Sequence, residues 1–152
     1  MAKRKRVLAM ASGGGHWVQL GRLRPVFEMH DTAYVTTHPD YRVEVPDSRF
    51  YAVSDVTRMS LGRLFILVPQ LVRILLKERP DVIITTGSAP ALVCLAMARV
   101  ITRARTIWID SIANCDRMST SGKHARRVAH ICLTQWPKLS QPGGPTFWGA
   151  VL

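Results

Sequence analysis

The chain has 152 residues, the size of one compact domain, so we expect residues 1–152 to fold around a single core. Hydrophobic residues make up 47% and charged residues 20% of it, which excludes an intrinsically disordered chain. The 21 Lys and Arg outnumber the 10 Asp and Glu, and the net charge of +11 predicts anionic partners: nucleic acid, an anionic membrane surface or a phosphorylated small molecule.

The first half of the chain predicts strands alternating with helices. Each expected strand is a short apolar or β-branched run, and each expected helix has apolar residues at intervals of three and four. The strands are predicted over 7–11, 32–37 and 50–53, the helices over 16–27 and 61–77, and a loop over 39–48.

The second half continues the alternation. Strands are predicted over 81–86, 105–109 and 131–135, and helices over 91–100 and 124–129. Strands that alternate with helices throughout imply an α/β fold with a Rossmann-like, doubly wound parallel sheet. In such a fold the ligand site lies at the carboxyl ends of the strands.

A glycine loop joins the first expected strand to the first helix and consists of Ser12, Gly13, Gly14, Gly15 and His16. Backbone N–H groups and the helix dipole at this point can bind an anionic phosphate. The dinucleotide fingerprint would require a sixth-position glycine where Val18 stands, and no Gly-Lys-Ser/Thr follows as in a Walker loop. The alternative is a tight turn without a ligand.

Two later loops are expected at the same sheet edge. Thr86, Gly87 and Ser88 form a second ligand wall, or Ser88 only caps the following helix. Asp110 ends another strand within expected reach of His16, and a histidine oriented by a carboxylate can take a proton from a sugar hydroxyl. The alternative is that Asp110 merely caps a loop.

A polar and basic stretch follows. Its hydroxyls, glycine and cations could clamp a diphosphate, and the residues concerned are Arg117, Ser119, Gly122 and Lys123. In the alternative interpretation, Ser121 is the N-cap of a basic surface helix.

The long helix predicted in the middle of the chain has a narrow polar stripe and an unusually broad apolar surface. With a rotation of 100° per residue, the polar stripe consists of Arg63, Gln70, Arg73 and Lys77. The apolar run is too short to span a bilayer and contains Pro69. Three alternatives remain: the helix lies in an anionic membrane interface, packs on a partner subunit, or is a fully buried core helix.

The chain end is apolar, which predicts docking to another protein through Trp136, Trp148 and Leu152, or folding back on the chain's own core. Neither the histidines nor the cysteines have metal-ligand spacing, so we expect no metal. Three scattered cysteines and an apolar run too short for an export signal predict a reducing cytosol. Lacking any nucleic-acid-binding motif, the chain is not expected to bind nucleic acid.

Together these motifs resemble the asparagine-linked glycosylation protein 14 family and its bacterial relatives, the exopolysaccharide-biosynthesis glycosyltransferase subunits. The resemblance covers nearly the whole chain and is carried, in order, by the GGGH loop, TTGSAP, the pair Asp110-Ser111, the S-x-S-G-K stretch and the terminal QWPKL with its aromatic-Gly.

The resemblance implies one half-domain of a split GT-B glycosyltransferase, without a cofactor. This half would hold a polyprenyl-diphosphate-linked acceptor, with the glycine loop receiving the diphosphate, His16 as candidate base, and Thr86, Gly87, Ser88 and Pro90 as second wall. It would recruit a second subunit that carries most of the UDP-sugar site, and would be inactive alone. Its expected place is peripheral, on the cytoplasmic side of the membrane.

The chain departs from the family pattern at two positions. Asp110 stands where relatives usually carry glutamate, and Asn114 where an arginine is common, although Arg117 could compensate. The transmembrane anchor of eukaryotic members is not found, so membrane contact is expected through the amphipathic helix or the partner. The competing function is a non-catalytic scaffold that anchors an enzyme to the membrane.

Overall fold

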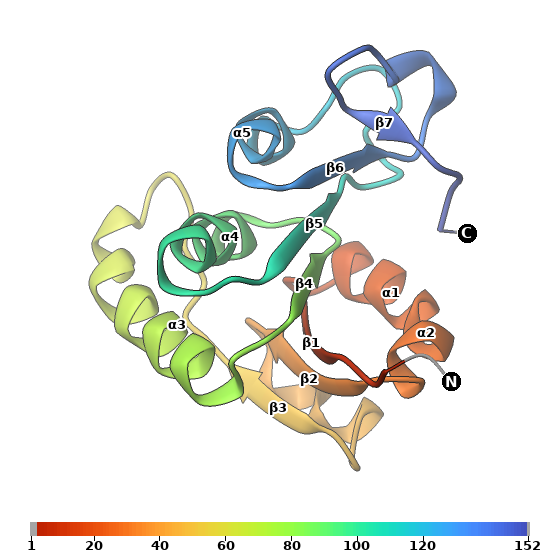
Figure 1. The fold of residues 1–152 in the computed structure, drawn as a ribbon. Helices are drawn as coiled ribbons and strands as arrows, with labels where there is room; N and C mark the ends of the chain where they lie inside the picture. Colours follow the sequence, from red (N-terminus) through yellow and green to blue (C-terminus); the bar gives the residue numbers. More distant parts are fainter. Residues whose placement is uncertain (1–2, 152) are drawn as a thin grey trace.

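The computed structural model describes residues 3–151, and in this part of the chain seven strands form one parallel sheet (Figure 1). Their order across the sheet is β3-β2-β1-β4-β5-β6-β7. The strands are β1 (Arg6–Met10), β2 (Asp31–Thr36), β3 (Arg49–Ala52), β4 (Val82–Thr85), β5 (Arg105–Ile109), β6 (Ile131–Thr134) and β7 (Thr146–Phe147).

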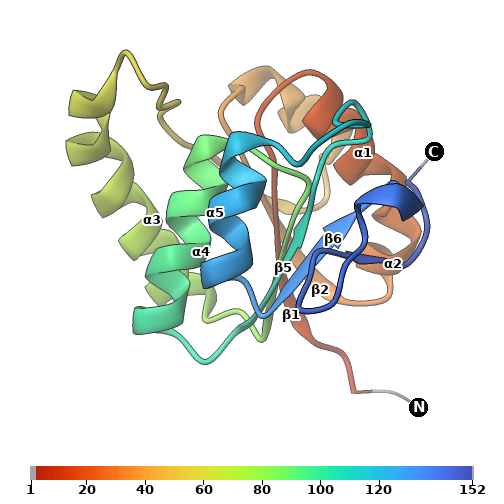
Figure 2. The same cartoon turned by 90° about the horizontal axis from the view of Figure 1, so that it is seen from above.

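Helices cover both faces of the sheet. Figures 1 and 2 show α1 and α2 on one face and α3, α4 and α5 side by side on the other. The helices are α1 (Gly15–Arg22), α2 (Arg24–Glu28), α3 (Leu64–Glu78), α4 (Ala89–Ile101) and α5 (Thr120–Val128), with 3-10 turns η1 (Pro39–Glu44), η2 (Leu61–Arg63) and η3 (Pro137–Leu139). None of the described helices is long and apolar enough to cross a bilayer.

Strand β1 lies inside the sheet, between β2 and β4, and its side chains enter two core layers, one on each face. Val7 and Ala9 face the α1 layer, whereas Leu8 and Met10 face the α3 layer, as the alternation of side chains along a strand requires. The chain moves outward from β1 to β3 and then returns to β4 on the other side of β1. This is the predicted Rossmann-like, doubly wound topology, and its switch point lies between β1 and β4.

Several predicted element boundaries are wrong. The helix expected over 16–27 is two helices, broken at Leu23, after which Pro25 opens the first turn of α2. The helix expected over 124–129 begins four residues earlier as α5. The expected loop 39–48 contains the 3-10 turn η1, and β7 was not predicted.

Helix α3 buries one face only. Leu67, Leu71, Ile74 and Leu75 lie in the core, whereas Phe65 on the outer side is 88% exposed. The alternative of a fully buried core helix is therefore wrong, and the surplus apolar surface lies on the outside of the molecule.

Candidate functional site

The glycine loop and the Thr86–Ser88 loop meet at the switch point of the sheet. β1 ends at Met10 and α1 begins at Gly15, so the loop places the N-terminus of α1 at the carboxyl edge of the sheet. Gly14 has φ +64° and is exposed, as is Gly15. The N-cap residue of α1 is Gly14, which has no side chain to accept the first N–H groups of the helix, and such a helix N-terminus is suited to bind an anion.

His16 bridges the two loops and is the centre of the site. Its Nδ1 lies 2.8 Å from the carbonyl oxygen of Thr86, and the Thr86 hydroxyl donates to the His16 carbonyl at 2.6 Å. A carbonyl only accepts hydrogen bonds, so in the neutral ring Nδ1 carries the hydrogen and Nε2 keeps a lone pair. That tautomer is the one a general base requires.

The imidazole packs directly on Gly87. A Cβ at this position would lie 2.8 Å from two atoms of the His16 ring, and Gly87 has φ +117°. Both the close approach and the backbone conformation require glycine. Gly87 therefore belongs to the site as the surface against which His16 is held.

Ser88 has a strained backbone, with φ 137° in a region that side chains rarely occupy. Its hydroxyl accepts the N–H of Ala91 at 3.1 Å and so caps α4. The predicted cap is confirmed, and the strain beside His16 is of the kind that concentrates at functional sites.

Within residues 3–151, Asp110 forms no hydrogen bond with His16 and is instead the centre of a separate buried cluster. It is 2% exposed. Its carboxylate accepts hydrogen bonds from the Trp108 indole at 3.1 Å, the Asn114 amide at 3.2 Å, and the backbone N–H and hydroxyl of Ser119 at 2.8 and 2.6 Å. The expected pairing with His16 is thus corrected: both carboxylate oxygens hold the loop that leads into α5.

This cluster also engages two residues expected to bind diphosphate. Ser119 caps α5 by accepting the N–H of Gly122 at 2.8 Å, so the alternative cap at Ser121 is wrong. Gly122 is buried against Asp110, with no room for a side chain. Of the four residues in this stretch, Arg117 and Lys123 are the exposed ones.

The sequence interpretation missed His38 and Tyr41, which lie over the glycine loop. The Tyr41 hydroxyl accepts the N–H of Gly14 at 3.0 Å, and the Tyr41 ring stacks on Trp17 with centroids 4.9 Å apart. The His38 ring packs so closely on Gly13 that a side chain there would collide with it. Their position after β2, whose carboxyl end shares the edge, was the available signal.

The C-terminal segment folds back on the molecule. The N–H of Val151 donates to Gln135 Oε1 at 2.7 Å, and the Gln135 amide donates to Gln19 of α1 at 2.6 Å. The Trp136 indole donates to the carbonyl of Ile112 at 2.7 Å, whereas Trp148 is 66% exposed. Of the two predicted alternatives, folding back on the chain's own core is therefore confirmed for this segment. The exposed side chain of Trp148 remains available for a partner. Leu152 lies outside the described residues.

The thiol of Cys132 in β6 lies 3.9 Å from the Gly122 carbonyl of α5. Burial, together with the nearby charge of Asp110, raises the pKa of Cys132 to about 12, so its thiol stays protonated at neutral pH. Among residues 3–151 no cluster of three or more His, Cys, Asp or Glu side chains is arranged to hold a metal ion.

Three longer proteins of known structure have a similar fold. Acinetobacter baumannii MurG matches with a TM-score of 0.73 and 14% identity, over 93% of this chain and 44% of MurG. UDP-N-acetylglucosamine 2-epimerase from Rickettsia bellii matches with a TM-score of 0.67 and 14% identity, over 95% of this chain and 44% of the epimerase. Anabaena Alr3699/HepE, solved with UDP and glucose, matches with a TM-score of 0.58 and 18% identity, over 87% of this chain and 38% of HepE.

These likenesses define the fold as that of one GT-B half-domain, because this chain spans less than half of each of these three proteins. No curated protein sequence matches the chain. A sequence model of the family described as "Oligosaccharide biosynthesis protein Alg14 like" matches residues 12–151, which contain the glycine loop, the Thr86–Ser88 loop and the Asp110 cluster. The chain therefore belongs to the Alg14-like family of oligosaccharide biosynthesis proteins.

Proposed function

We propose that this chain, as a single Rossmann-like domain over residues 1–152, is the acceptor-binding subunit of a two-component glycosyltransferase. The enzyme would move a sugar from a UDP-sugar to a polyprenyl-diphosphate-linked glycan in polysaccharide or lipid-linked oligosaccharide biosynthesis. The observation that carries the proposal is the position of His16, held across the switch point by Thr86 with Nε2 available.

The proposed chemistry is one proton transfer coupled to one displacement. His16 Nε2 takes the proton of an acceptor sugar hydroxyl, whose oxygen forms a bond to the anomeric carbon of the donor sugar. The bond from that carbon to the diphosphate oxygen breaks, and UDP leaves. Asp110, proposed from sequence as a second catalytic group, acts in this account by positioning the loop before α5.

Acceptor binding is assigned to the anion-binding end of α1. Ser12, Gly13 and Gly15 would present backbone N–H groups to the diphosphate, with Thr86, Gly87 and Ser88 as the opposite wall. Gly14 would shape the loop, because its N–H donates to the Tyr41 hydroxyl. Exposed Arg117 and Lys123 supply charge across the edge. Ser119 and Gly122, engaged by Asp110, would support this wall without touching the ligand.

The donor site is assigned to a partner subunit. The chain spans 44% of MurG and 38% of the UDP-bound HepE, and we propose that another chain supplies the part that matches the rest of these proteins. Exposed Trp148, with Trp136 and Leu152 near it in sequence, is proposed as partner contact. Without this partner the chain would be inactive, and it would work peripherally at the cytoplasmic side of an anionic membrane.

The test is transfer of labelled sugar from a panel of UDP-sugars into a lipid-extractable polyprenyl-diphosphate acceptor, with this chain alone and with a co-expressed donor-binding partner. Transfer only with both chains supports the proposal and identifies the sugar. Transfer by this chain alone would contradict the split donor site. Absence of transfer, with acceptor and partner both shown to be present, would favour the scaffold.

A further inference from the structure

Helix α3 carries a second apolar stripe on the side facing away from the sheet. Phe65, Pro69, Val72 and Leu76 follow one another at steps of four, three and four residues and so share one helix face. Phe65 is 88% and Leu76 56% exposed. Residues exposed on the same helix or just before it extend this surface: Met59, Leu61, Ile66 and Val68. A contiguous exposed apolar surface of this kind marks an interaction site.

Cations border the stripe. Arg73 and Lys77 are exposed and line a shallow groove with Val72 and Leu76. Arg58 and Arg63 are exposed at the opposite end of the stripe, beside Met59 and Leu61. The pattern is that of an interfacial helix, in which apolar side chains insert and flanking cations reach anionic headgroups.

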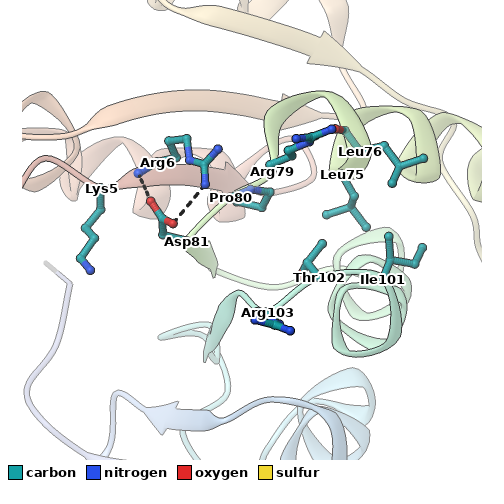
Figure 3. Close-up of a pocket in the computed structure, with 10 residues that line it drawn as sticks. All are labelled: Lys5, Arg6, Leu75, Leu76, Arg79, Pro80, Asp81, Ile101, Thr102 and Arg103. Carbon is teal, nitrogen blue, oxygen red and sulfur yellow. Dashed lines mark hydrogen bonds and ion pairs between the residues drawn. The ribbon is translucent and has the colours of Figure 1, made fainter.

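At its far end the stripe opens into a basic pocket of about 550 Å³ (Figure 3). The pocket lies at the amino edge of the sheet, away from His16, and Leu76 lines both it and the groove. Its cationic residues come from the start of β1, the end of α3 and the turn before β5: Lys5, Arg6, Arg79 and Arg103.

The pocket has more cations than its carboxylate can neutralise. Asp81 accepts the backbone N–H of Arg6 at 2.8 Å and its guanidinium at 3.3 Å. Lys5, Arg79 and Arg103 form no ion pair with any described residue. The carbonyl ends of α3 and α4 attract cations here, but that attraction does not account for the exposed apolar side chains beside them.

We infer that the outer face of α3 lies on an anionic bilayer, with the stripe inserted and the basic pocket binding the phosphate of a phospholipid headgroup. The inference deepens the proposed function, on which it rests for the presence of a membrane-bound acceptor. α3 runs from the turn after β3 to the turn before β4, so its first residues start at the carboxyl edge that carries His16. A bilayer against α3 would therefore bring a lipid-linked acceptor beside the site.

Insertion of the apolar stripe is tested by flotation of the full chain with vesicles of phosphatidylcholine, with or without phosphatidylglycerol. The wild-type chain should bind only the anionic vesicles. Phe65→Asp and Leu76→Asp should each weaken binding about tenfold or more, because an inserted side chain is lost. Met29→Asp is the control, since Met29 is 69% exposed but lies at the end of α2 in the opposite layer.

Headgroup binding by the basic pocket is tested with the double variant Lys5→Gln/Arg103→Gln in the same flotation assay. Loss of two cations at the headgroup layer should weaken binding about thirtyfold. The control Arg126→Gln/Arg127→Gln removes the same charge from exposed positions on α5 and should leave binding nearly unchanged. Unaltered thermal unfolding of each variant keeps the comparison interpretable.

Three results would overturn the inference: wild-type chain that fails to prefer anionic vesicles, Phe65→Asp or Leu76→Asp that binds as wild type, and Lys5→Gln/Arg103→Gln that loses no more than its control. If Phe65→Asp instead turns a dimer into a monomer without changing vesicle binding, the face belongs to a second copy. The vesicles hold neither donor nor acceptor, so failed sugar transfer with intact flotation contradicts the proposed function alone.

Discussion

His16 depends on its immediate neighbours for both its position and its tautomer. Thr86 contacts it at the ring Nδ1 and at the backbone carbonyl, and Gly87 provides the flat surface beneath the ring. The histidine and the glycine loop could be predicted from the sequence, because three glycines follow an apolar run. The group that orients the His16 ring could not be predicted from the sequence, because it is the backbone carbonyl of Thr86 and every residue has such a carbonyl.

Gly87→Ala should disturb the site more than the fold. The new Cβ would collide with the His16 ring and the residue would keep φ +117°, so we expect a loss of about 1–3 kcal/mol in unfolding free energy. Displacement of the base should lower the transfer rate about a hundredfold. Urea unfolding and single-turnover transfer measure the two effects.

Gly62→Ala is the matched control for this variant, because a Cβ there meets no atom within 4 Å. It should leave stability and transfer near wild type. Equal transfer by Gly87→Ala and Gly62→Ala would show that the position of the His16 ring does not matter for the reaction.

Tyr34 makes stability depend on pH in the alkaline range. Burial in the α1 layer is the main cause that raises the pKa of Tyr34 above its usual value near 10. As pH rises, the Tyr34 hydroxyl therefore loses its proton first in the unfolded chain. The contribution of protonated Tyr34 to the free energy of unfolding is full below about pH 10 and is lost as pH rises through the higher pKa of the folded state. Urea unfolding at increasing pH should show a steeper decline in wild type than in Tyr34→Phe; equal slopes would contradict this.

Element boundaries follow tertiary contacts as much as local signals. Ser119 and Ser121 are both suitable N-caps, and local preference does not decide between them. Asp110 decides, because it binds both the N–H and the hydroxyl of Ser119 and so fixes where α5 starts. β7 was missed for a related reason: two residues carry no strand pattern, and only β6 defines them as a strand.

Ser119→Ala should therefore destabilise the protein while Ser121→Ala should not. The first variant loses the cap of α5 and a hydrogen bond to a buried carboxylate, which together should cost about 2–3 kcal/mol. Denaturant unfolding of the two variants gives the comparison directly. Similar destabilisation by both would contradict the assigned start of the helix.

At the scale of the whole molecule, the two edges of the sheet carry different features. The carboxyl edge holds His16 and the glycine loop, and the amino edge holds the basic pocket next to the outer face of α3. The net charge of +11 predicted anionic partners, and the sheet topology predicted the edge of the site. The sequence could not predict which side of α3 is free, because apolar residues surround most of that helix.

Trp148 offers a test of partner recruitment that leaves the fold intact. Because its side chain is 66% exposed, Trp148→Ala should cost little stability but weaken co-purification of the donor-binding subunit about tenfold or more. Trp136→Ala is the contrasting variant, since it removes the hydrogen bond to Ile112 and should lower the melting temperature. Undiminished co-purification of Trp148→Ala would exclude this contact.

The central claim is that the chemistry occurs on this chain, at His16. The most direct measurement is sugar transfer to a polyprenyl-diphosphate acceptor by wild type and His16→Ala, each co-expressed with the partner and matched for partner bound. We predict that His16→Ala lowers transfer about 10²–10⁴-fold, the usual contribution of a general base, with partner binding unchanged. Transfer at the wild-type rate would contradict the claim and make the chain a scaffold.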